Sequence, residues 1–508
     1  MLLEKIVHQA RRRPDEIAIV DDQRSVSFGH LILASQMMAG FVDRAMPGTD
    51  RVGLLIPQSA GFAVAFLGAR WTGRTVVPLN YLLKVDELLL IARAADLKYV
   101  VTIGYFKELA QGLERAGVRV LFMEQMAFKA LWPRVKARVW QRRLPERRPD
   151  DVATILYTSG TSAVPKGVML TNANLDSNAA DAIEHARFND QMTFLGVLPM
   201  FHTLGLMACF LVPLSLGCKV VYQARFNPAA VLEAIKKHHV EVLIAVPTMY
   251  ALLANCKSAS RESLASVRYA ISGGEPLPLA LVQKFRDQFG IPLLEGFGLT
   301  ETSPIVSLST PWACKPGYVG RPIPHQQLRI VSDNGVDLPA NQDGELWVKG
   351  PNVMRGYYHD PEATAAVLTP DGWFKTGDIA RIDEEGFLAI TGRKKEMIIM
   401  AGEKIAPGEI EEVIRKHPAV LLVAVIAAKD PQRGEVPVAF VQLEPGLAQP
   451  PTAQDIRVFV RSRLAPYKTP RDVYFVDDMP RSPTGKILKR ALVIPTAAPI
   501  NQTATESP

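Results

Sequence analysis

Short apolar runs alternate with segments of helical pattern along the first part of the chain. Between the runs, Ser59–Trp71 and Val85–Ala95 carry apolar residues at the spacing of a helix that buries one face. The same alternation continues from Phe194 to Leu294. It predicts an α/β fold of layered subdomains around a largely parallel sheet. The runs typical of strands are Ile17–Val20, Arg51–Ile56, Thr75–Pro78, Tyr99–Thr102, Lys219–Tyr222 and Val242–Val246.

The pattern changes after Lys315, where short strands are separated by turns rich in Gly, Pro and Asp, such as Asp333-Asn334-Gly335. This texture predicts a small β-rich, barrel-like module at about residues 315–390. After Arg393 the pattern favours a compact α+β unit. The length of 508 residues fits about three domain-sized units. We predict a large N-terminal domain of residues 1–393, a small C-terminal domain of residues 394–492 and a disordered tail of residues 493–508.

Two apolar segments bear on membrane insertion, and neither predicts a span. The N-terminal segment is interrupted by acidic and polar residues too early for a signal peptide. The most apolar run, Leu204–Cys218, has about 15 residues and contains Pro213, whereas a span needs roughly 20. We therefore expect a buried element there and a cytoplasmic protein. The spacing of a short amphipathic helix is present at Leu2, Leu3, Ile6, Val7 and Ala10.

The composition is ordinary for a soluble globular protein, with 48% apolar and 21% charged residues. It excludes disordered, collagen-like and coiled-coil chains. The formal net charge of +7 permits anionic partners but identifies none. The four cysteines form no Cys-x-x-Cys pair, so neither a disulfide framework nor a thiolate zinc site is expected.

The segment Arg134–Arg148 holds seven Lys or Arg residues and one acidic residue, Glu146, so its local charge of +6 nearly equals that of the whole chain. A solvated helix and linker is the favoured interpretation, since charge runs are usually solvated faces. The alternative is weak contact with an anionic membrane surface, which would make the protein peripheral to the membrane. A nucleic-acid partner would rest on this segment alone and is not expected.

The segment from Thr158 to Gly167 follows a strand-like run and reads Thr-Ser-Gly-Thr-Ser-Ala-Val-Pro-Lys-Gly. Its hydroxyls and backbone N–H groups can donate to phosphate oxygens, its glycines let the backbone approach closely, and its lysine adds charge. A simple turn is the alternative. The segment resembles the signature loop of the adenylate-forming (ANL) enzymes, a superfamily that includes acyl- and aryl-CoA synthetases. The resemblance implies that pyrophosphate is held by Thr158, Ser159, Gly160, Thr161, Ser162 and Lys166.

The run Glu295–Glu301, Glu-Gly-Phe-Gly-Leu-Thr-Glu, resembles the adenine and metal motif of the same superfamily. An aromatic ring such as Phe297 can stack on a purine, and Gly298 lies beside it. Glu301 is a hard oxygen ligand suited to Mg²⁺ that also contacts phosphate. The resemblance implies catalytic roles for Glu301 and for Thr300, which would donate to the α-phosphate.

Two further runs resemble the ribose and hinge motifs. In Lys375-Thr376-Gly377-Asp378, Asp378 would accept hydrogen bonds from the ribose hydroxyls. In Gly392-Arg393-Lys394-Lys395-Glu396, Arg393 would also reach the ribose, and Lys395 occupies the position of the hinge. About this hinge the C-terminal domain of the superfamily rotates between two half-reactions.

The last two runs resemble the thiol loop and the C-terminal motif. Pro480–Lys486 would carry the catalytic Lys486. Six such runs in one order, from Thr158 to Lys486, identify the chain as a member of the superfamily. The thiol-facing residues implied by the loop Gly402–Pro407 are Gly402, Glu403 and Lys404.

The segment Leu198–Leu206 gives information on the acid substrate. It resembles the acyl-pocket motif of acyl-CoA synthetases and contains His202, a further catalytic candidate. Amino-acid-activating relatives commonly place an aspartate in this region, and none is present here. A buried ammonium without a carboxylate partner would be costly. Ser272–Leu277, with Gly274 and Glu275, resembles the segment that lines the acyl and nucleotide sites. The residue pattern is most like that of medium- or long-chain fatty acyl-CoA ligases, and the next most similar pattern is that of aryl ligases of the 4-coumarate type.

The resemblance implies a ligase that uses ATP and Mg²⁺ to make an acyl-adenylate, then transfers the acyl group to a thiol. No phosphopantetheine site follows Lys486, so we expect the thiol from outside, as coenzyme A or a separate acyl carrier protein. Besides a ligase that uses coenzyme A and one that uses an acyl carrier protein, the third alternative is a relative without catalytic activity. The residues that argue against it are Lys486, Glu301, Asp378 and Arg393.

Overall fold

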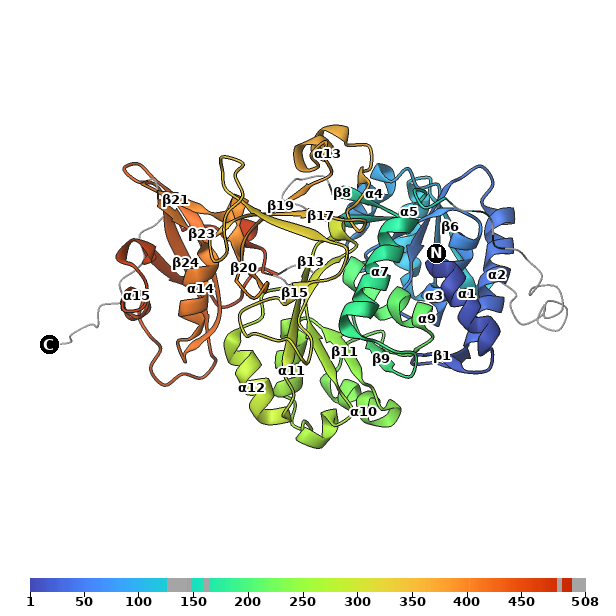
Figure 1. The fold of residues 1–508 in the computed structure, drawn as a ribbon, viewed down its shortest axis with the longest axis horizontal. Coiled ribbons are helices and arrows are strands. Elements are labelled where there is room, and N and C mark those ends of the chain that lie inside the picture. Colours follow the sequence, from blue (N-terminus) through green and yellow to red (C-terminus); the bar gives the residue numbers. More distant parts are fainter. Residues whose placement is uncertain are drawn as a thin grey trace. The chain divides into compact units, whose positions relative to one another are not determined.

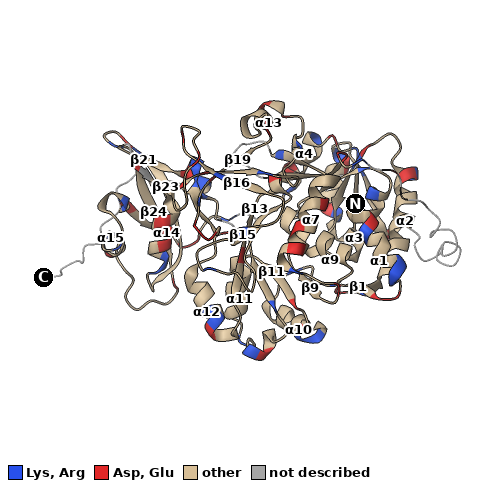
Figure 2. Ribbon diagram, viewed as in Figure 1, with Lys and Arg blue, Asp and Glu red and all other residues tan. Residues whose placement is uncertain are grey.

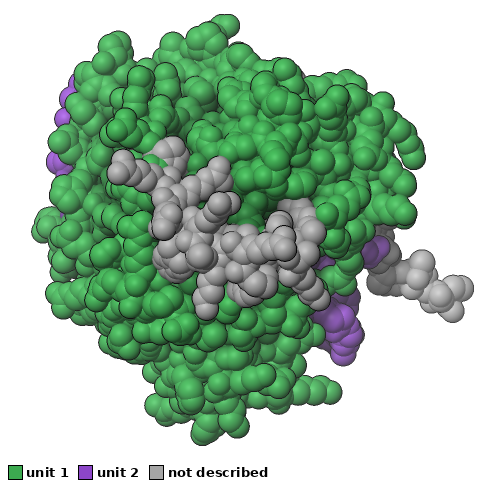
Figure 3. All heavy atoms as spheres, turned by 90° about the vertical axis from the view of Figure 1, so that its right-hand side faces the viewer, with its two compact units in different colours: residues 1–329, 347–376, 384–388 green, residues 330–346, 377–383, 389–508 purple. Residues whose placement is uncertain are grey.

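The computed structural model describes residues 1–125, 144, 146, 148–158, 165–401, 403–481 and 487–495. The chain forms two compact units (Figures 1 and 3). Unit 1 consists of residues 1–329, 347–376 and 384–388, and unit 2 of residues 330–346, 377–383 and 389–508. Helices and strands are mixed in the large N-terminal part and in the small C-terminal part, which confirms the predicted fold class. The domain boundaries predicted from the sequence stay predictions.

The largest sheet of unit 1 has nine strands, in the order β15-β14-β13-β12-β11-β9-β10-β1-β2. The run from β1 to β13 in this order is parallel throughout, and the edge strands β2, β14 and β15 are antiparallel. The parallel centre confirms the prediction from alternating strands and helices. The strands are β1 Ile17–Val20, β2 Ser25–Ser27, β9 Thr193–Gly196, β10 Lys219–Tyr222, β11 Val242–Ala245, β12 Tyr269–Ser272, β13 Leu293–Gly298, β14 Ile305–Leu308 and β15 Arg321–Pro322.

The second sheet of unit 1 has seven strands, in the order β18-β8-β7-β4-β3-β5-β6. Five of them, β7, β4, β3, β5 and β6, form a parallel run. Strands β7 and β8 form an antiparallel hairpin, and β18 adds to the free side of β8. The strands are β3 Arg51–Leu55, β4 Thr75–Pro78, β5 Tyr99–Thr102, β6 Arg119–Phe122, β7 Val152–Thr158, β8 Lys166–Thr171 and β18 Gly356–Tyr357.

Helices cover these sheets with apolar faces. Figure 1 shows α10, α11 and α12 around β11, and buried side chains of these helices form one core with the strands β11, β12 and β13. Helix α3 packs closely on α2, because a Cβ at Gly68 would lie only 2.5 Å from Met38 Cγ. The helices of unit 1 are α1 Leu2–Arg12, α2 Phe28–Ala45, α3 Ala60–Trp71, α4 Val85–Ala94, α5 Lys107–Arg115, α7 Asn172–Ala186, α8 Thr203–Leu206, α9 Val212–Leu216, α10 Pro228–His238, α11 Pro247–Ala254, α12 Leu279–Phe289 and α13 Pro361–Val367.

The two apolar segments lie as expected. The five apolar positions of α1 are all buried, which confirms the amphipathic helix. The run Leu204–Cys218 forms α8, a π-helical turn Met207–Leu211 and α9, and most of its residues are buried in the core of unit 1. Among the described residues, no helix has both the length and the apolar character that a membrane crossing requires.

Unit 2 contains a sheet in the order β22-β21-β24-β23, with β25 paired to β24. The amphipathic helices α14 and α15 contribute Ile410 and Ile456 to the same core as these strands. The β-rich module expected after Lys315 contains a separate sheet in the order β16-β17-β19-β20. The elements are β16 Gln327–Val331, β17 Gly344–Lys349, β19 Phe374–Ile382, β20 Leu388–Arg393, β21 Ile398–Met400, β22 Glu403–Ile405, α14 Pro407–Arg415, β23 Val420–Asp430, β24 Gly434–Leu443, α15 Ala453–Arg461 and β25 Asp472–Phe475.

Charged residues of both signs are mixed along the described helices and loops, as Figure 2 shows. Most of the basic segment Arg134–Arg148 lies outside the described residues, so its solvated and membrane-contacting interpretations both stay predictions. The predicted tail also lies outside them, apart from its first residues, Val493–Pro495.

Candidate active site

The candidate site of unit 1 lies where parallel strands of the nine-stranded sheet end. Ligands of α/β proteins bind outside the carboxyl ends of such strands. Here β12 leads into Ser272–Leu277 and β13 ends at Gly298, directly after Phe297. A Cβ at Gly273 would lie 3.4 Å from both the Gly296 carbonyl oxygen and Leu204 Cδ2. The structure therefore brings together the adenine motif, the glycine-rich segment and the predicted acyl motif.

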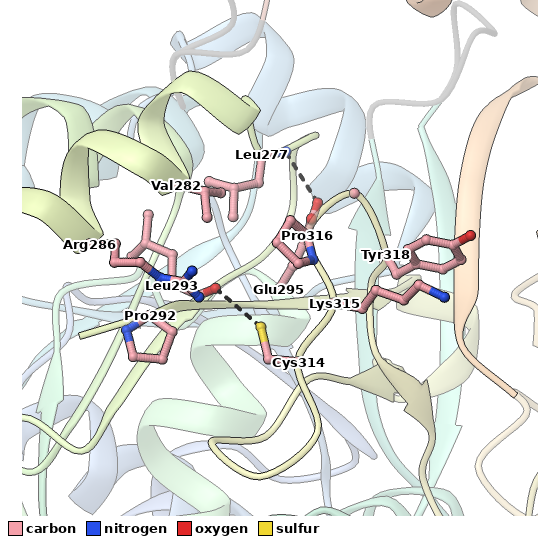
Figure 4. A pocket seen from close by; sticks show the side chains of 11 residues that line it. Leu277, Val282, Arg286, Pro292, Leu293, Glu295, Cys314, Lys315, Pro316 and Tyr318 are labelled. Carbon is pink, nitrogen blue, oxygen red and sulfur yellow. Dashed lines mark hydrogen bonds between the residues drawn. The ribbon is translucent and has the colours of Figure 1, made fainter. Parts of the chain in front are cut away.

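Glu295 ties two of these segments to each other. Its Oε1 accepts a hydrogen bond of 3.1 Å from the backbone N–H of Leu277 (Figure 4). Burial raises the pKa of the Glu295 carboxyl to about 7, against the opposing effect of the Leu277 hydrogen bond. In the segment Ser272–Leu277, Gly274 has φ +86°, a backbone conformation that favours glycine. The side chain of Glu275 is half-buried beside it.

A small cavity lies beside Glu295, between α12 and the loop Cys314–Tyr318 (Figure 4). Leu277, Arg286 and Cys314 are among its lining residues, and its volume is about 10 Å³. A cavity of that size can hold about one water. The cavity adjoins the adenine motif at Glu295 and is too small for a nucleotide.

Thr300 and Glu301 lie in a 3₁₀ turn, Thr300–Thr302, that follows β13. Thr203 Oγ1 donates to Thr300 Oγ1 at 3.0 Å, which connects the acyl motif to the predicted α-phosphate donor. Glu301 Oε1 accepts a hydrogen bond of 2.9 Å from the hydroxyl of Tyr357. The backbone N–H of Met354 donates to the Glu301 carbonyl oxygen at 2.8 Å. The turn is thus held from two sides.

The predicted phosphate loop connects β7 to β8. Thr158 and Lys166 are its described ends, and they face each other across the hairpin. Lys166 Nζ lies 4.8 Å from the ring centroid of Tyr357. The residues Ser159, Gly160, Thr161 and Ser162 lie outside the described residues. The structure therefore places Lys166 and Glu301 around one tyrosine.

His202 lies at the start of α8, in a recess. Its side chain is exposed by surface area, yet surrounding protein atoms remove enough water to lower its pKa to about 4. The imidazole is therefore neutral at pH 7. Its ring centroid lies 4.5 Å from that of Phe201, and Phe201 meets Tyr81 edge to face at 4.9 Å. An aromatic wall thus flanks this histidine.

The residues predicted to bind the ribose lie in unit 2 and contact each other. Arg393 Nε lies 2.8 Å from Asp378 Oδ1, and Asp378 is buried. The next residue, Lys394, pairs with Glu345 at 2.8 Å. Lys395 is exposed in the 3₁₀ turn Lys394–Glu396.

The remaining predicted residues of unit 2 belong to the thiol loop and the C-terminal motif. Glu403 is exposed at the start of β22, and Lys404 is the next residue of that strand. Gly402 and Lys486 lie outside the described residues. The roles assigned to these residues from the sequence stay predictions.

Two groups of contacts were not predicted from the sequence. The first is made by Tyr357, whose partner Glu301 is 56 residues away in the chain. The other is a row of polar residues on one face of α7, whose spacing of about four residues along a predicted helix was a usable signal. The row consists of Asn174, Asn178, Asp181 and His185.

The row on α7 holds the segments that flank Glu301. Asn178 Nδ2 donates to the Ile305 carbonyl at 2.8 Å, and its Oδ1 accepts from the Ile305 N–H at 3.2 Å. Asn174 Nδ2 donates to the carbonyls of Pro351 and Val353, both at 2.8 Å. Since α7 follows β8 directly, the same helix connects the phosphate-loop hairpin to the metal motif.

The donor set fits a metal ion that arrives with a nucleotide. Among the described residues, no cluster of three or more His, Cys, Asp or Glu side chains could hold a metal by itself. Mg²⁺ usually binds one or two carboxylates and completes its shell with phosphate oxygens and waters. Glu301 and Lys166 contact the same tyrosine, so one carboxylate and one cation lie close to each other, which fits that requirement.

Comparison with known proteins gives consistent matches over the chain. The model of the AMP-binding enzyme family matches residues 6–358, and that of the AMP-binding enzyme C-terminal domain matches residues 409–486. A 4-coumarate–CoA ligase from Pinus taeda is 33% identical over 475 residues, which cover 91% of this chain and 88% of that protein. A long-chain-fatty-acid–CoA ligase from Bacillus subtilis is 32% identical over 529 residues, covering 96% and 93%.

The solved structures include a similar fold with a bound nucleotide. The O-succinylbenzoate coenzyme A synthetase MenE from Bacillus subtilis, in complex with ATP and a magnesium ion, superposes with a TM-score of 0.84. It is 30% identical, and the match covers 96% of this chain and 98% of that chain.

Proposed function

The chain belongs to the AMP-binding enzyme family, and we propose that its acid substrate is a medium- or long-chain fatty acid. As a member of this family it is an AMP-forming acyl-CoA ligase. It uses ATP and Mg²⁺ and takes a small-molecule acid and coenzyme A as substrates. The choice of a fatty acid goes beyond the family, because fatty acyl and aryl ligases are equally similar to this chain.

One observation carries the proposal of an aliphatic acid. Between Leu198 and Met207 the chain has no acidic residue, and its only ionisable side chain is His202. That histidine is neutral at pH 7, because desolvation lowers its pKa to about 4. An amino-acid substrate would therefore find no carboxylate there for its ammonium group. An uncharged, apolar chain suits this neighbourhood best.

We propose the following roles in the first half-reaction. An oxygen of the carboxylate forms a bond to the α-phosphorus, and the bond to pyrophosphate breaks. Bound Mg²⁺ would supply positive charge to the phosphate oxygens. Thr158, Lys166 and the loop between them hold the departing pyrophosphate, and Thr300 donates to the α-phosphate. Catalysis is then chiefly positioning and charge neutralisation, since an anion approaches a polyanion.

The nucleoside and the catalytic lysine have their own proposed contacts. Phe297 stacks on the adenine, and Asp378 with Arg393 binds the ribose. Lys486 neutralises charge as the adenylate forms. Further nucleotide-binding residues proposed from the motifs are Gly274, Glu275 and Gly298.

The second half-reaction is proposed to use other residues of the C-terminal part. The thiol attacks the acyl carbon, the bond from that carbon to the AMP oxygen breaks, and AMP leaves. Lys395 serves as the hinge that exchanges Lys486 for the thiol loop. The residues of that loop are Gly402, Glu403 and Lys404.

An aryl acid is the second candidate, and the aromatic wall favours it. Tyr81 and Phe201 meet edge to face at 4.9 Å beside His202. Edge-to-face and stacked contacts also suit a flat aryl substrate. The similarity to a 4-coumarate–CoA ligase supports the same candidate.

The test is pyrophosphate release from MgATP across acids from acetate to palmitate and one aryl propenoate, with and without coenzyme A. We expect the highest release, stimulated by coenzyme A, among the longer aliphatic acids. A peak on the aryl acid would replace the fatty acid by the second candidate. Stimulation by an added acyl carrier protein but not by coenzyme A would contradict coenzyme A as acceptor.

A further inference from the structure

We infer that Tyr357 is a positioning residue that orients Glu301, and the neighbouring Lys166, for MgATP. The inference rests on the proposed function, because it assigns Glu301 to the metal and Lys166 to the phosphates. Tyr357 contacts both groups, with its hydroxyl on Glu301 and its ring face on Lys166.

The hydrogen bond to Glu301 has a defined direction. A protonated phenol donates and an ionised carboxylate only accepts. The 2.9 Å bond therefore runs from Tyr357 to Glu301 Oε1. It fixes one carboxylate oxygen and orients the other, Oε2, for a metal.

The ring of Tyr357 also acts on Lys166. The ammonium lies 4.8 Å from the ring centroid, within the distance of about 6 Å at which a cation is attracted to an aromatic face. Among the described residues, no ion pair joins Lys166 to Glu301. The ring gives the lysine a neutral partner.

The backbone around Tyr357 fixes the ring in this place. Strand β18 pairs with β8 so that Tyr357 lies opposite Val168, two residues from Lys166 on the same strand. The N–H of Tyr357 donates to Thr364 Oγ1 at 2.9 Å, and that of Tyr358 donates to the Gly167 carbonyl at 2.7 Å. Only 7% of Tyr357 is exposed. The position of the hydroxyl is thus set by the hairpin that carries the phosphate loop.

The chain offers a matched control in the next residue. The hydroxyl of Tyr358 also donates to a carboxylate, that of Asp96, at 2.9 Å. This second pair has no part in the proposed site. Tyr357→Phe and Tyr358→Phe each delete one phenolic oxygen from a tyrosine–carboxylate pair on the same segment.

The experiment is calorimetric titration of the full-length protein with MgATP and, separately, with ATP in excess EDTA. A hydrogen bond to a charged group is worth enough to change affinity about tenfold or more. We expect Tyr357→Phe to weaken MgATP binding about tenfold and to change binding of metal-free ATP less than about twofold. Tyr358→Phe should leave both affinities unchanged. Equal losses for both forms of ATP, or no loss for either, would overturn the inference.

A double-mutant cycle tests the same inference without depending on one variant. In a Glu301→Gln background, Tyr357→Phe should cause no further loss of MgATP affinity, because the tyrosine acts on the metal through Glu301. Additive losses would contradict a positioning role. Wild-type protein that binds no MgATP would instead contradict the proposed function. If wild type binds and only the Tyr357→Phe result fails, the proposed function stands and the inference falls.

Discussion

At the scale of single residues, Glu295 links the stability of the fold to protonation. It is anchored to Leu277 and has a pKa raised to about 7 by burial, from an ordinary value of 4.5. Between these two values the folded protein retains a proton that the unfolded chain has released. Stability therefore falls as pH rises through this window and levels off above about pH 7.

Glu295→Gln tests this directly, because the amide resembles the protonated acid and does not titrate. We expect the variant to gain melting temperature relative to wild type as pH rises from 5 to 7, with a constant difference above that. Thermal unfolding followed by circular dichroism from pH 5 to 8 measures it. Glu114→Gln, at an exposed position of α5, controls for the loss of one negative charge. A difference independent of pH would show that Glu295 does not titrate in this range.

The sequence could single out Phe297 and Glu301 as candidates, because both belong to one contiguous motif, Glu295–Glu301. It could not predict Tyr357. That role arises only when β18 pairs with β8 and brings the tyrosine to a carboxylate 56 residues away. It also gave no sign that His202 would be neutral, since the lowered pKa depends on surrounding atoms from distant segments.

At the scale of elements, α7 is the part of the fold that joins the phosphate loop to the metal motif. Its amphipathic pattern is unusual, because the buried face carries asparagines that serve backbone groups of other segments. A buried backbone N–H that loses its partner costs free energy. The helix is therefore held in register by hydrogen bonds as well as by packing.

Asn178→Leu tests this role. Asn178 is fully buried, and the variant leaves the Ile305 N–H without its partner. We expect the free energy of unfolding to fall by about 2 kcal/mol, and the KM for MgATP to rise because the turn that carries Glu301 loosens. Urea unfolding and steady-state kinetics measure the two effects. Glu184→Leu, on the exposed face of the same helix, is the control. A stable variant with an unchanged KM for MgATP would contradict the role of α7 in holding the turn that carries Glu301.

The pattern of the sequence predicted elements better than their pairing. The strands Ile17–Val20, Thr75–Pro78 and Tyr99–Thr102 have the predicted bounds, and α4 ends one residue early. Period and β-branched content decide such elements locally. The order of strands in a sheet depends on contacts between distant segments, so neither the nine-stranded order nor the place of β18 could be derived from the pattern.

At the scale of the whole molecule, the two compact units and the family membership support one central claim, that the chain makes an acyl-adenylate before it makes a thioester. The carboxylate must then form a bond to the α-phosphorus. One carboxyl oxygen must remain with AMP when the thiol attacks the acyl carbon. The transfer of this oxygen atom to AMP distinguishes the reaction from activation through an acyl phosphate, in which orthophosphate receives it.

The most direct test is turnover of an acid labelled with ¹⁸O in both carboxyl oxygens, with MgATP and coenzyme A, followed by mass spectrometry of the products. We expect AMP that carries one ¹⁸O atom, unlabelled pyrophosphate, and acyl-CoA that retains the other ¹⁸O atom. Unlabelled AMP, or ADP accompanied by labelled orthophosphate, would contradict it.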